Sequence, residues 1–224
     1  MAVRSIDVSR WSNELLWLRR YLAPYVKRYY GEKVFTYVVK RFEGAYEVIL
    51  RSRLRVSSTI PKGSGVAMVL VSSRALEEGP ERVVRVRTLS GDVVEVVLGT
   101  PLEESYHIVQ VGPYGLKCTC RDALMLASRA DSEFIAAAKL YGVKRFELQT
   151  PLFTKYVLCK HTLAAAAYAL ASNVLSRDLK VFREVLKLSA LGAALRVLGG
   201  SGVRRSAVIR SYNVMLRLSR GLPP

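Results

Sequence analysis

Three cysteines and two histidines among 224 residues leave little material for disulfides or for metal sites. The odd cysteine count excludes a disulfide-rich scaffold and fits a reducing compartment, where closely spaced thiols are more often metal ligands. Acidic residues are also scarce, at 18 against 35 basic ones, and the formal net charge is +17. Such a chain attracts polyanions, so we expect a nucleic acid as partner, with an acidic protein as the alternative.

Long apolar segments are missing as well. The opening MAVRSIDVSRW lacks the apolar core of a secretory signal. The longest uncharged runs, such as Thr162 to Ser176, fall short of the roughly 18 residues that a membrane-spanning helix needs. We therefore expect a protein that does not associate with membranes and that resides in the cytoplasm or on the nucleoid.

Catalytic motifs are equally absent. The stretches GSG and GGSG lack the lysine and the strand-to-helix context of a phosphate-binding loop, and no nucleophile stands beside a base. Asp131 and Glu133 could form a nuclease-like metal pair, but acidic residues at the start of a helix usually serve its cap and dipole. His107 could act as a base or fifth ligand, although a lone histidine in a strand is more often structural. We expect a binding protein and not an enzyme.

The first part of the chain, residues 1–103, is predicted to be a basic α+β region. From Ser9 to Tyr30 the apolar residues recur with a helical period and form one stripe. Arg20, Lys27 and Arg28 lie away from this stripe, and we assign them to nucleic-acid binding. Trp17 also falls among the basic residues, where it could stack on a base or be covered by another element of the same chain.

Beyond Gly44 the period changes to two in AYEVILRSRLRVS, which predicts a strand with one buried face and arginines on the other. VAMVLV predicts a buried strand, and ERVVRVRTLSGDVVEVVLG predicts a hairpin. Together these strands predict an antiparallel sheet with an arginine-bearing face, which either contacts phosphates or is simply solvated. The arginines assigned to nucleic-acid binding on this face are Arg51, Arg53, Arg55, Arg85 and Arg87.

All three cysteines lie in the second part of the chain, residues 104–175. YHIVQV and YGLKC predict two strands that deliver Cys118 and Cys120, and KYVLCKHTLAAAA places Cys159 and His161 at the start of an alanine-rich helix. Zinc in a structural site takes four thiolate or imidazole ligands in a tetrahedron. The two pairs therefore predict a Zn²⁺ site with these four side chains as ligands.

Helical patterns fill the remainder of the chain. The spacer from Arg121 to Leu158 is 38 residues long and contains a predicted helix. This helix is either continuous or divided in two, with Asp131 as the cap of the second piece. The final part, residues 176–224, shows two further helical patterns, at 178–198 and 203–218.

The order CTC, then CKH, with an aromatic-led strand before it and a helix directly after it, resembles the SWIM zinc finger. The pattern of that family is C-x-C followed by C-x-H in a strand-strand-helix unit. The resemblance covers about Glu104 to Asn173. The spacer exceeds the couple of dozen residues usual in the family, so a helical insert must loop out of the unit.

The resemblance implies a zinc-stabilised interaction module. SWIM units occur in chromatin remodellers, transposases, ubiquitin-pathway proteins and small partners of recombinase paralogues, and the last group matches this chain best in size. It implies an accessory protein that binds DNA in preference to RNA during recombination, repair or related DNA transactions. The alternative is an adaptor whose C-terminal helices dock on a larger nucleic-acid-associated complex.

The expected fold class is α+β. An N-terminal helix and antiparallel sheet come first, then a zinc-stabilised ββα unit with a helical insert, and finally a C-terminal helical segment.

Overall fold

The computed structural model describes residues 7–50, 54–56, 66–72, 81–87, 93–99, 106–143 and 146–224, with the backbone alone for residues 54–56, 72, 81–87, 93–99 and 106. The fold is mixed α+β, as predicted. The α-helices are α1 (Val8–Tyr30), α2 (Glu32–Leu50), α3 (Arg121–Leu140), α4 (Lys160–Ala171), α5 (Lys180–Leu198) and α6 (Arg205–Ser219). The strands are β1 (Leu54–Val56), β2 (Ala67–Ser72), β3 (Glu81–Arg87), β4 (Val93–Gly99), β5 (Tyr106–Gly112) and β6 (Gly115–Cys118), and a short 3₁₀-helix, η1, spans Phe153–Lys155.

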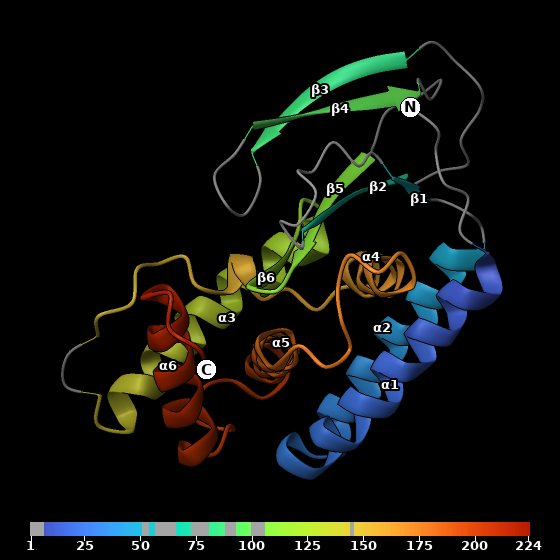
Figure 1. Ribbon diagram of the computed structural model, residues 1–224. Helices are drawn as coiled ribbons and strands as arrows, with labels where there is room; N and C mark the ends of the chain where they lie inside the picture. The colour runs from blue at the N-terminus through green and yellow to red at the C-terminus, as the bar shows by residue number, and fades with distance from the viewer. Residues whose placement is uncertain are drawn as a thin grey trace.

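An antiparallel sheet with the strand order β1-β2-β5-β6 lies above the helices in Figure 1. β2 pairs with β5 from Ala67 opposite Val111 to Ser72 opposite Tyr106, and β5 continues into a hairpin with β6. β3 and β4 form the predicted hairpin as a separate two-stranded sheet. The four-stranded sheet therefore joins two strands from residues 1–103, β1 and β2, with two strands from residues 104–175, β5 and β6.

α4 lies between the sheet and helices α1 and α2 (Figure 1) and packs on α1, α2 and β5. Ala164, Ala165, Ala166 and Ala167 are fully buried, because small side chains let neighbouring elements approach the helix from several sides. The Trp11 indole N–H donates to the Ala164 carbonyl at 2.8 Å. The N-terminal helix is thus fixed directly to the helix that begins at the predicted metal site.

The prediction of a strand beginning at Ala45 is wrong for residues 45–50, because these residues belong to helix α2. Ile49, expected on the polar face of a strand, is fully buried, whereas Tyr46 and Leu50, expected on the buried face, are 44% and 55% exposed. Gly44 does not end the helix. A Cβ there would lie 3.3 Å from the Lys160 side chain, so glycine lets α2 pass close to the start of α4.

The helix after Cys120 is one continuous element, which corrects the prediction that Asp131 caps a second piece. Asp131 lies in the middle of α3, buried, and its Oδ1 accepts the backbone N–H groups of Leu152 and Phe153 at 2.8 and 2.9 Å. Burial raises the pKa of this carboxyl group, and the two hydrogen bonds oppose that rise. Asp131 therefore holds the returning chain against α3 rather than starting a helix.

The two predicted C-terminal helices are present as α5 and α6. α5 is buried along most of its length and touches α1, α2 and α3, while α6 packs against α3 and α5. Among the described residues, no helix is both long enough and apolar enough to cross a bilayer.

Candidate metal centre

The four predicted ligands converge in one buried cluster. The ligand atoms of Cys118, Cys120, Cys159 and His161 all lie within 4.8 Å of one another, and Cys118 Sγ is 3.8 Å from His161 Nδ1. In a tetrahedral zinc site with bonds of about 2.3 Å to sulfur and 2.0 Å to nitrogen, neighbouring ligand atoms lie about 3.5 to 3.8 Å apart. The cluster therefore has the donor types and nearly the spacing that a zinc ion requires.

One strand end and two helix starts supply these side chains. Cys118 ends β6, opposite Val109 of β5. Cys120 is the N-cap of α3, where its Sγ accepts the Ala123 N–H at 3.4 Å, and Cys159 is the N-cap of α4. Because the N-terminus of a helix carries a partial positive charge, both caps favour a thiolate.

A capping box fixes the second ligand pair. The Cys159 N–H donates to Thr162 Oγ1 at 3.0 Å, and the Thr162 N–H donates back to Cys159 Sγ at 3.4 Å. His161 lies between these two residues in the first turn of α4. The capping box therefore holds the Cys159 side chain at the start of α4, in the same turn as the second ligand of the pair, His161.

The long spacer returns to the site along β6. Tyr156 forms a parallel bridge with Leu116, and the Val157 N–H donates to the Leu116 carbonyl at 3.0 Å. Together with the anchor at Asp131, this pairing brings the chain back beside Cys118 just before Cys159. A spacer of this length is consequently compatible with a compact ligand cluster.

Hydrogen bonding and burial give the three thiols different proton affinities. Hydrogen bonds from the Cys118 and Cys159 thiols lower the pKa of Cys120 far below its ordinary value, and donating to Cys120 raises the pKa of Cys118. Burial raises the pKa of Cys159 to about 12. A divalent metal would supply positive charge that favours the thiolate form of the three cysteines.

His107, treated in the sequence as a lone structural histidine, lies on β5 against the ligand His161. The two ring centroids are 4.7 Å apart with an interplanar angle of 37°. Burial and the neighbouring His161 lower the pKa of His107. His107 therefore lies beside the cluster of four candidate ligands and is not one of them.

The supporting residues Asp131, His107 and Thr162 were not assigned to the site from the sequence. Only Thr162 carried a local signal, a hydroxyl three residues after the cap residue Cys159. Asp131 and His107 act on segments more than 20 residues away in the chain.

The residues assigned to nucleic-acid binding do not gather on one sheet. Arg51 and Arg53 fall outside the described residues, and the side chain of Arg55 is not described. β1, which carries Arg55, belongs to the four-stranded sheet, whereas Arg85 and Arg87 lie on β3 of the separate hairpin. The expectation of one arginine-bearing sheet is thereby corrected, because β2 pairs with β5 and not with β3.

On α1, the assigned residues Arg20, Lys27 and Arg28 are exposed, as predicted for a polar face. Lys27 pairs with Glu32 at 3.2 Å, and Arg28 lies over the Tyr29 ring at 5.7 Å.

Comparison with known proteins found no matching family model, no similar curated protein and no similar solved structure. The candidate metal centre therefore rests on the geometry of this chain alone, and the SWIM resemblance stays a prediction.

Proposed function

We propose that this chain is a zinc-stabilised accessory protein that binds nucleic acid, DNA in preference to RNA, in recombination, repair or related DNA transactions. The observation that supports the proposal best is the buried cluster of Cys118, Cys120, Cys159 and His161, with ligand atoms within 4.8 Å of one another. The net charge of +17 supports a polyanionic partner. The recombination and repair setting rests on the SWIM resemblance.

The proposed zinc has a structural role. Four protein ligands complete a tetrahedron and leave no position for a substrate or an activated water. The ligands come from β6, α3 and α4, so a bound ion would tie the sheet, the insert and α4 together. We accordingly propose that the protein binds its partner without catalysing a reaction.

Nucleic-acid binding is tested by titrating labelled duplexes of unrelated sequence with the protein at several salt concentrations. Phosphate contacts carry no sequence information, so we expect similar affinities for all sequences and a linear fall of log affinity with log salt. Replacing Arg51, Arg53 and Arg55 by glutamine should reduce that slope by up to about three units and leave the zinc content unchanged. Failure of the parent protein to bind any nucleic acid at low salt would contradict the proposal.

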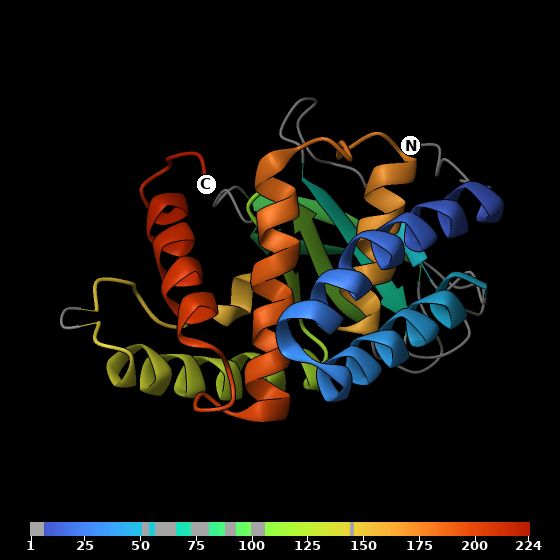
Figure 2. The ribbon, with the colours of Figure 1, turned by 90° about the horizontal axis from the view of Figure 1, so that it is seen from below.

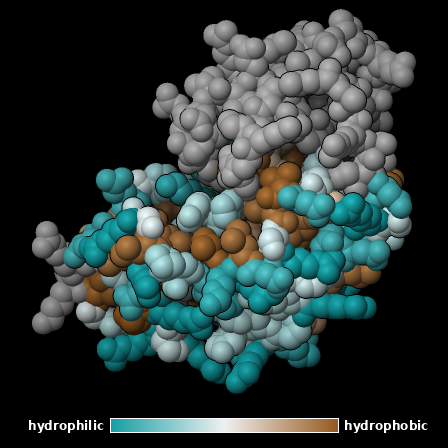
Figure 3. Space-filling model, viewed as in Figure 1, coloured by the Kyte–Doolittle hydropathy of each residue, from teal (hydrophilic) through white to brown (hydrophobic). Residues whose placement is uncertain are grey.

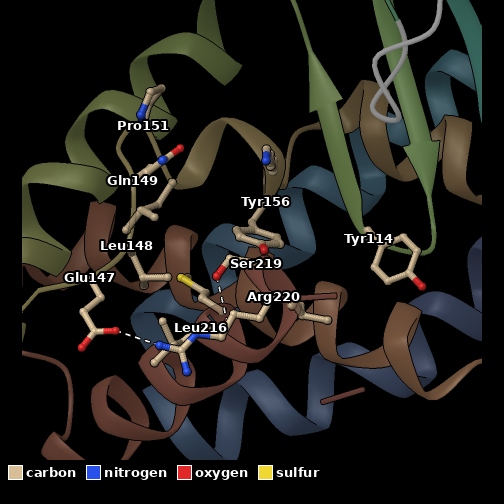
Figure 4. A pocket seen from close by; sticks show the side chains of 13 residues that line it. Tyr114, Glu147, Leu148, Gln149, Pro151, Tyr156, Leu216, Ser219 and Arg220 are labelled. Carbon is tan, nitrogen blue, oxygen red and sulfur yellow. Dashed lines mark hydrogen bonds and ion pairs between the residues drawn. The ribbon is translucent and has the colours of Figure 1, made fainter. Parts of the chain in front are cut away.

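A second candidate function, the protein-interaction adaptor, is favoured by a hollow of about 460 Å³ beside the C-terminal helix (Figure 4). Leu148 and Tyr156 of the returning insert line it together with Leu216 of α6, and the Glu147–Arg220 ion pair of 2.8 Å lies at its edge. Figure 3 shows hydrophobic residues gathered on this face around α6.

The two functions are separated by affinity capture from cell extract with and without nuclease. Partners that remain after nuclease treatment would favour the adaptor. Partners that are lost, together with salt-sensitive binding of purified DNA, would favour the nucleic-acid-binding protein.

A further inference from the structure

Four aromatic side chains form a row along α1. Trp17, Tyr21, Tyr25 and Tyr29 follow one another at intervals of four residues, so they lie on adjacent turns of the same side of the helix. The Trp17 and Tyr21 rings are stacked, with centroids 5.7 Å apart and an interplanar angle of 9°, and the Tyr25 and Tyr29 centroids are 4.6 Å apart. None of the four is fully buried, and Tyr29 is 37% exposed.

Every ring of this row has a cation over it. Three of the cations come from α5 or from the residues just before it, and one comes from α1. The four pairs are Arg177 over Trp17 at 5.6 Å, Arg183 over Tyr21 at 5.6 Å, Lys187 over Tyr25 at 5.9 Å and Arg28 over Tyr29 at 5.7 Å. Contacts of this geometry are attractive and hold the charged groups along the aromatic row.

Three rings of the row, Tyr21, Tyr25 and Tyr29, line one side of a groove, which we call the cation–aromatic groove. In Figure 2, α5 lies between α1 and α6 on this side of the molecule. Two hollows, of about 420 and 160 Å³, lie along α5 and share Glu184, Lys187, Arg210 and Val214 among their lining residues, so they adjoin. The larger contains Tyr21, and the smaller contains Tyr25 and Tyr29.

Positive charge dominates the larger hollow. Four cationic side chains line it, Lys180, Arg183, Lys187 and Arg210, against one acidic side chain, that of Glu184. Glu184 is shared between Lys187 and Arg210.

Two further acids pair with the cations at the rim. Asp178, which contacts Arg183 at 3.2 Å, has a side chain that is 94% exposed. Glu14 is nearly buried and pairs with Arg177. Because exposed ion pairs are weak, a phosphate group could replace Asp178 beside Arg183 at little cost.

We propose that the cation–aromatic groove binds single-stranded nucleic acid. Lys180, Arg183 and Arg210 would contact phosphates, and Tyr29 would stack on a base. This inference rests on the proposed function and adds to it the binding surface and the kind of strand.

The aromatic row favours a single strand over the other polyanions. Base faces are available for stacking in a single strand, whereas they are covered within a duplex. A phosphorylated peptide or a small anion would use the cations and leave the exposed Tyr29 ring without a stacking partner. Combined cations and aromatic rings in one groove are typical of sequence-tolerant single-strand binding.

The test uses the full chain with a fluorescently labelled oligodeoxythymidine of about 20 nucleotides and a labelled duplex of mixed sequence. The groove variant carries Lys180→Gln, Arg183→Gln and Arg210→Gln. The control variant carries Arg121→Gln, Arg129→Gln and Lys139→Gln, which remove the same charge from exposed positions on α3. Zinc content of both variants should equal that of the parent, since the replaced side chains lie outside the metal centre, and circular dichroism of both variants checks that they remain folded.

We expect the groove variant to lower single-strand affinity about 10- to 100-fold and to reduce the log-affinity against log-salt slope by about two units. The control variant should change the affinity less than about threefold. Tyr29→Ala should weaken single-strand binding at least about fivefold and leave duplex binding unchanged, because it removes a stacking surface and no charge.

Equal behaviour of the groove and control variants, with the parent still binding DNA, would overturn the groove assignment and leave the proposed function standing. Equal weakening of single-strand and duplex binding, with no effect of Tyr29→Ala, would overturn the single-strand assignment. Absence of any nucleic-acid binding by the parent would remove the proposed function and this inference together.

Discussion

The metal centre and the cation–aromatic groove bring polar groups together in opposite ways. In the candidate metal centre, four buried side chains from β6, α3 and α4 lie within 4.8 Å of one another at their ligand atoms. In the groove, half-exposed rings repeat along one helix and meet cations that stay in contact with water. The metal centre therefore depends on burial of its side chains, whereas the groove depends on being accessible to a partner. Changes in the metal centre should accordingly alter folding most, whereas changes in the groove should alter binding most.

The largest effect should follow loss of a metal ligand. We expect His161→Ala to release the metal and to lower the thermal midpoint by more than about 10 °C, because the binding free energy of a structural zinc is part of the folding free energy. Excess chelator should have the same effect on the parent protein. The midpoint is measured by circular dichroism, with metal analysis of each sample.

His161→Cys is the matched control, since a zinc site with four cysteines is also closed and tetrahedral. This variant should keep one zinc and most of the stability. An unchanged midpoint of the parent after confirmed metal removal would show that closure of the site does not support the fold.

A smaller effect is expected at the anchor of the insert. Asp131→Ala removes the acceptor of two N–H groups, those of Leu152 and Phe153, and should lower the free energy of unfolding by about 2 to 4 kcal/mol. Urea denaturation measures the loss. Ser132→Ala, at an exposed neighbouring position, should change stability by less than about 0.5 kcal/mol. Similar effects of the two substitutions would mean that the anchor does not hold the returning chain.

The smallest effect concerns the ring beside the ligand. His107→Ala should weaken zinc affinity about 2- to 10-fold, the range expected for losing one aromatic contact, while His107→Phe should keep most of it. Competition with a zinc-binding dye measures both. A loss as large as that of a ligand substitution would instead place His107 among the groups that hold the metal.

The sequence was sufficient for the features whose signals are local. The helix of residues 8–30 has an apolar stripe over six turns, and the hairpin before Cys118 has alternating residues around a turn. The ligand residues stand in two close pairs, each at the end of a recognisable strand or the start of a helix. Such signals need no knowledge of what packs against them.

Features that depend on distant partners could not be predicted in this way. The apolar pattern of residues 45–50 fits a strand period of two as well as a helical period. In the structure these residues are helical, and Ile49 is buried in the core. The acceptor role of Asp131 depends on a segment 21 residues later in the chain. The aromatic residues of α1 were visible in the sequence, but the cations above three of them lie about 160 residues away.

The central claim, a structural zinc held by Cys118, Cys120, Cys159 and His161, is tested most directly by counting metal in protein purified without metal-affinity steps. Elemental analysis and native mass spectrometry should give one zinc per folded parent chain and none in Cys159→Ala. Well-folded parent protein without zinc, or Cys159→Ala that retains zinc with unchanged affinity, would contradict the claim.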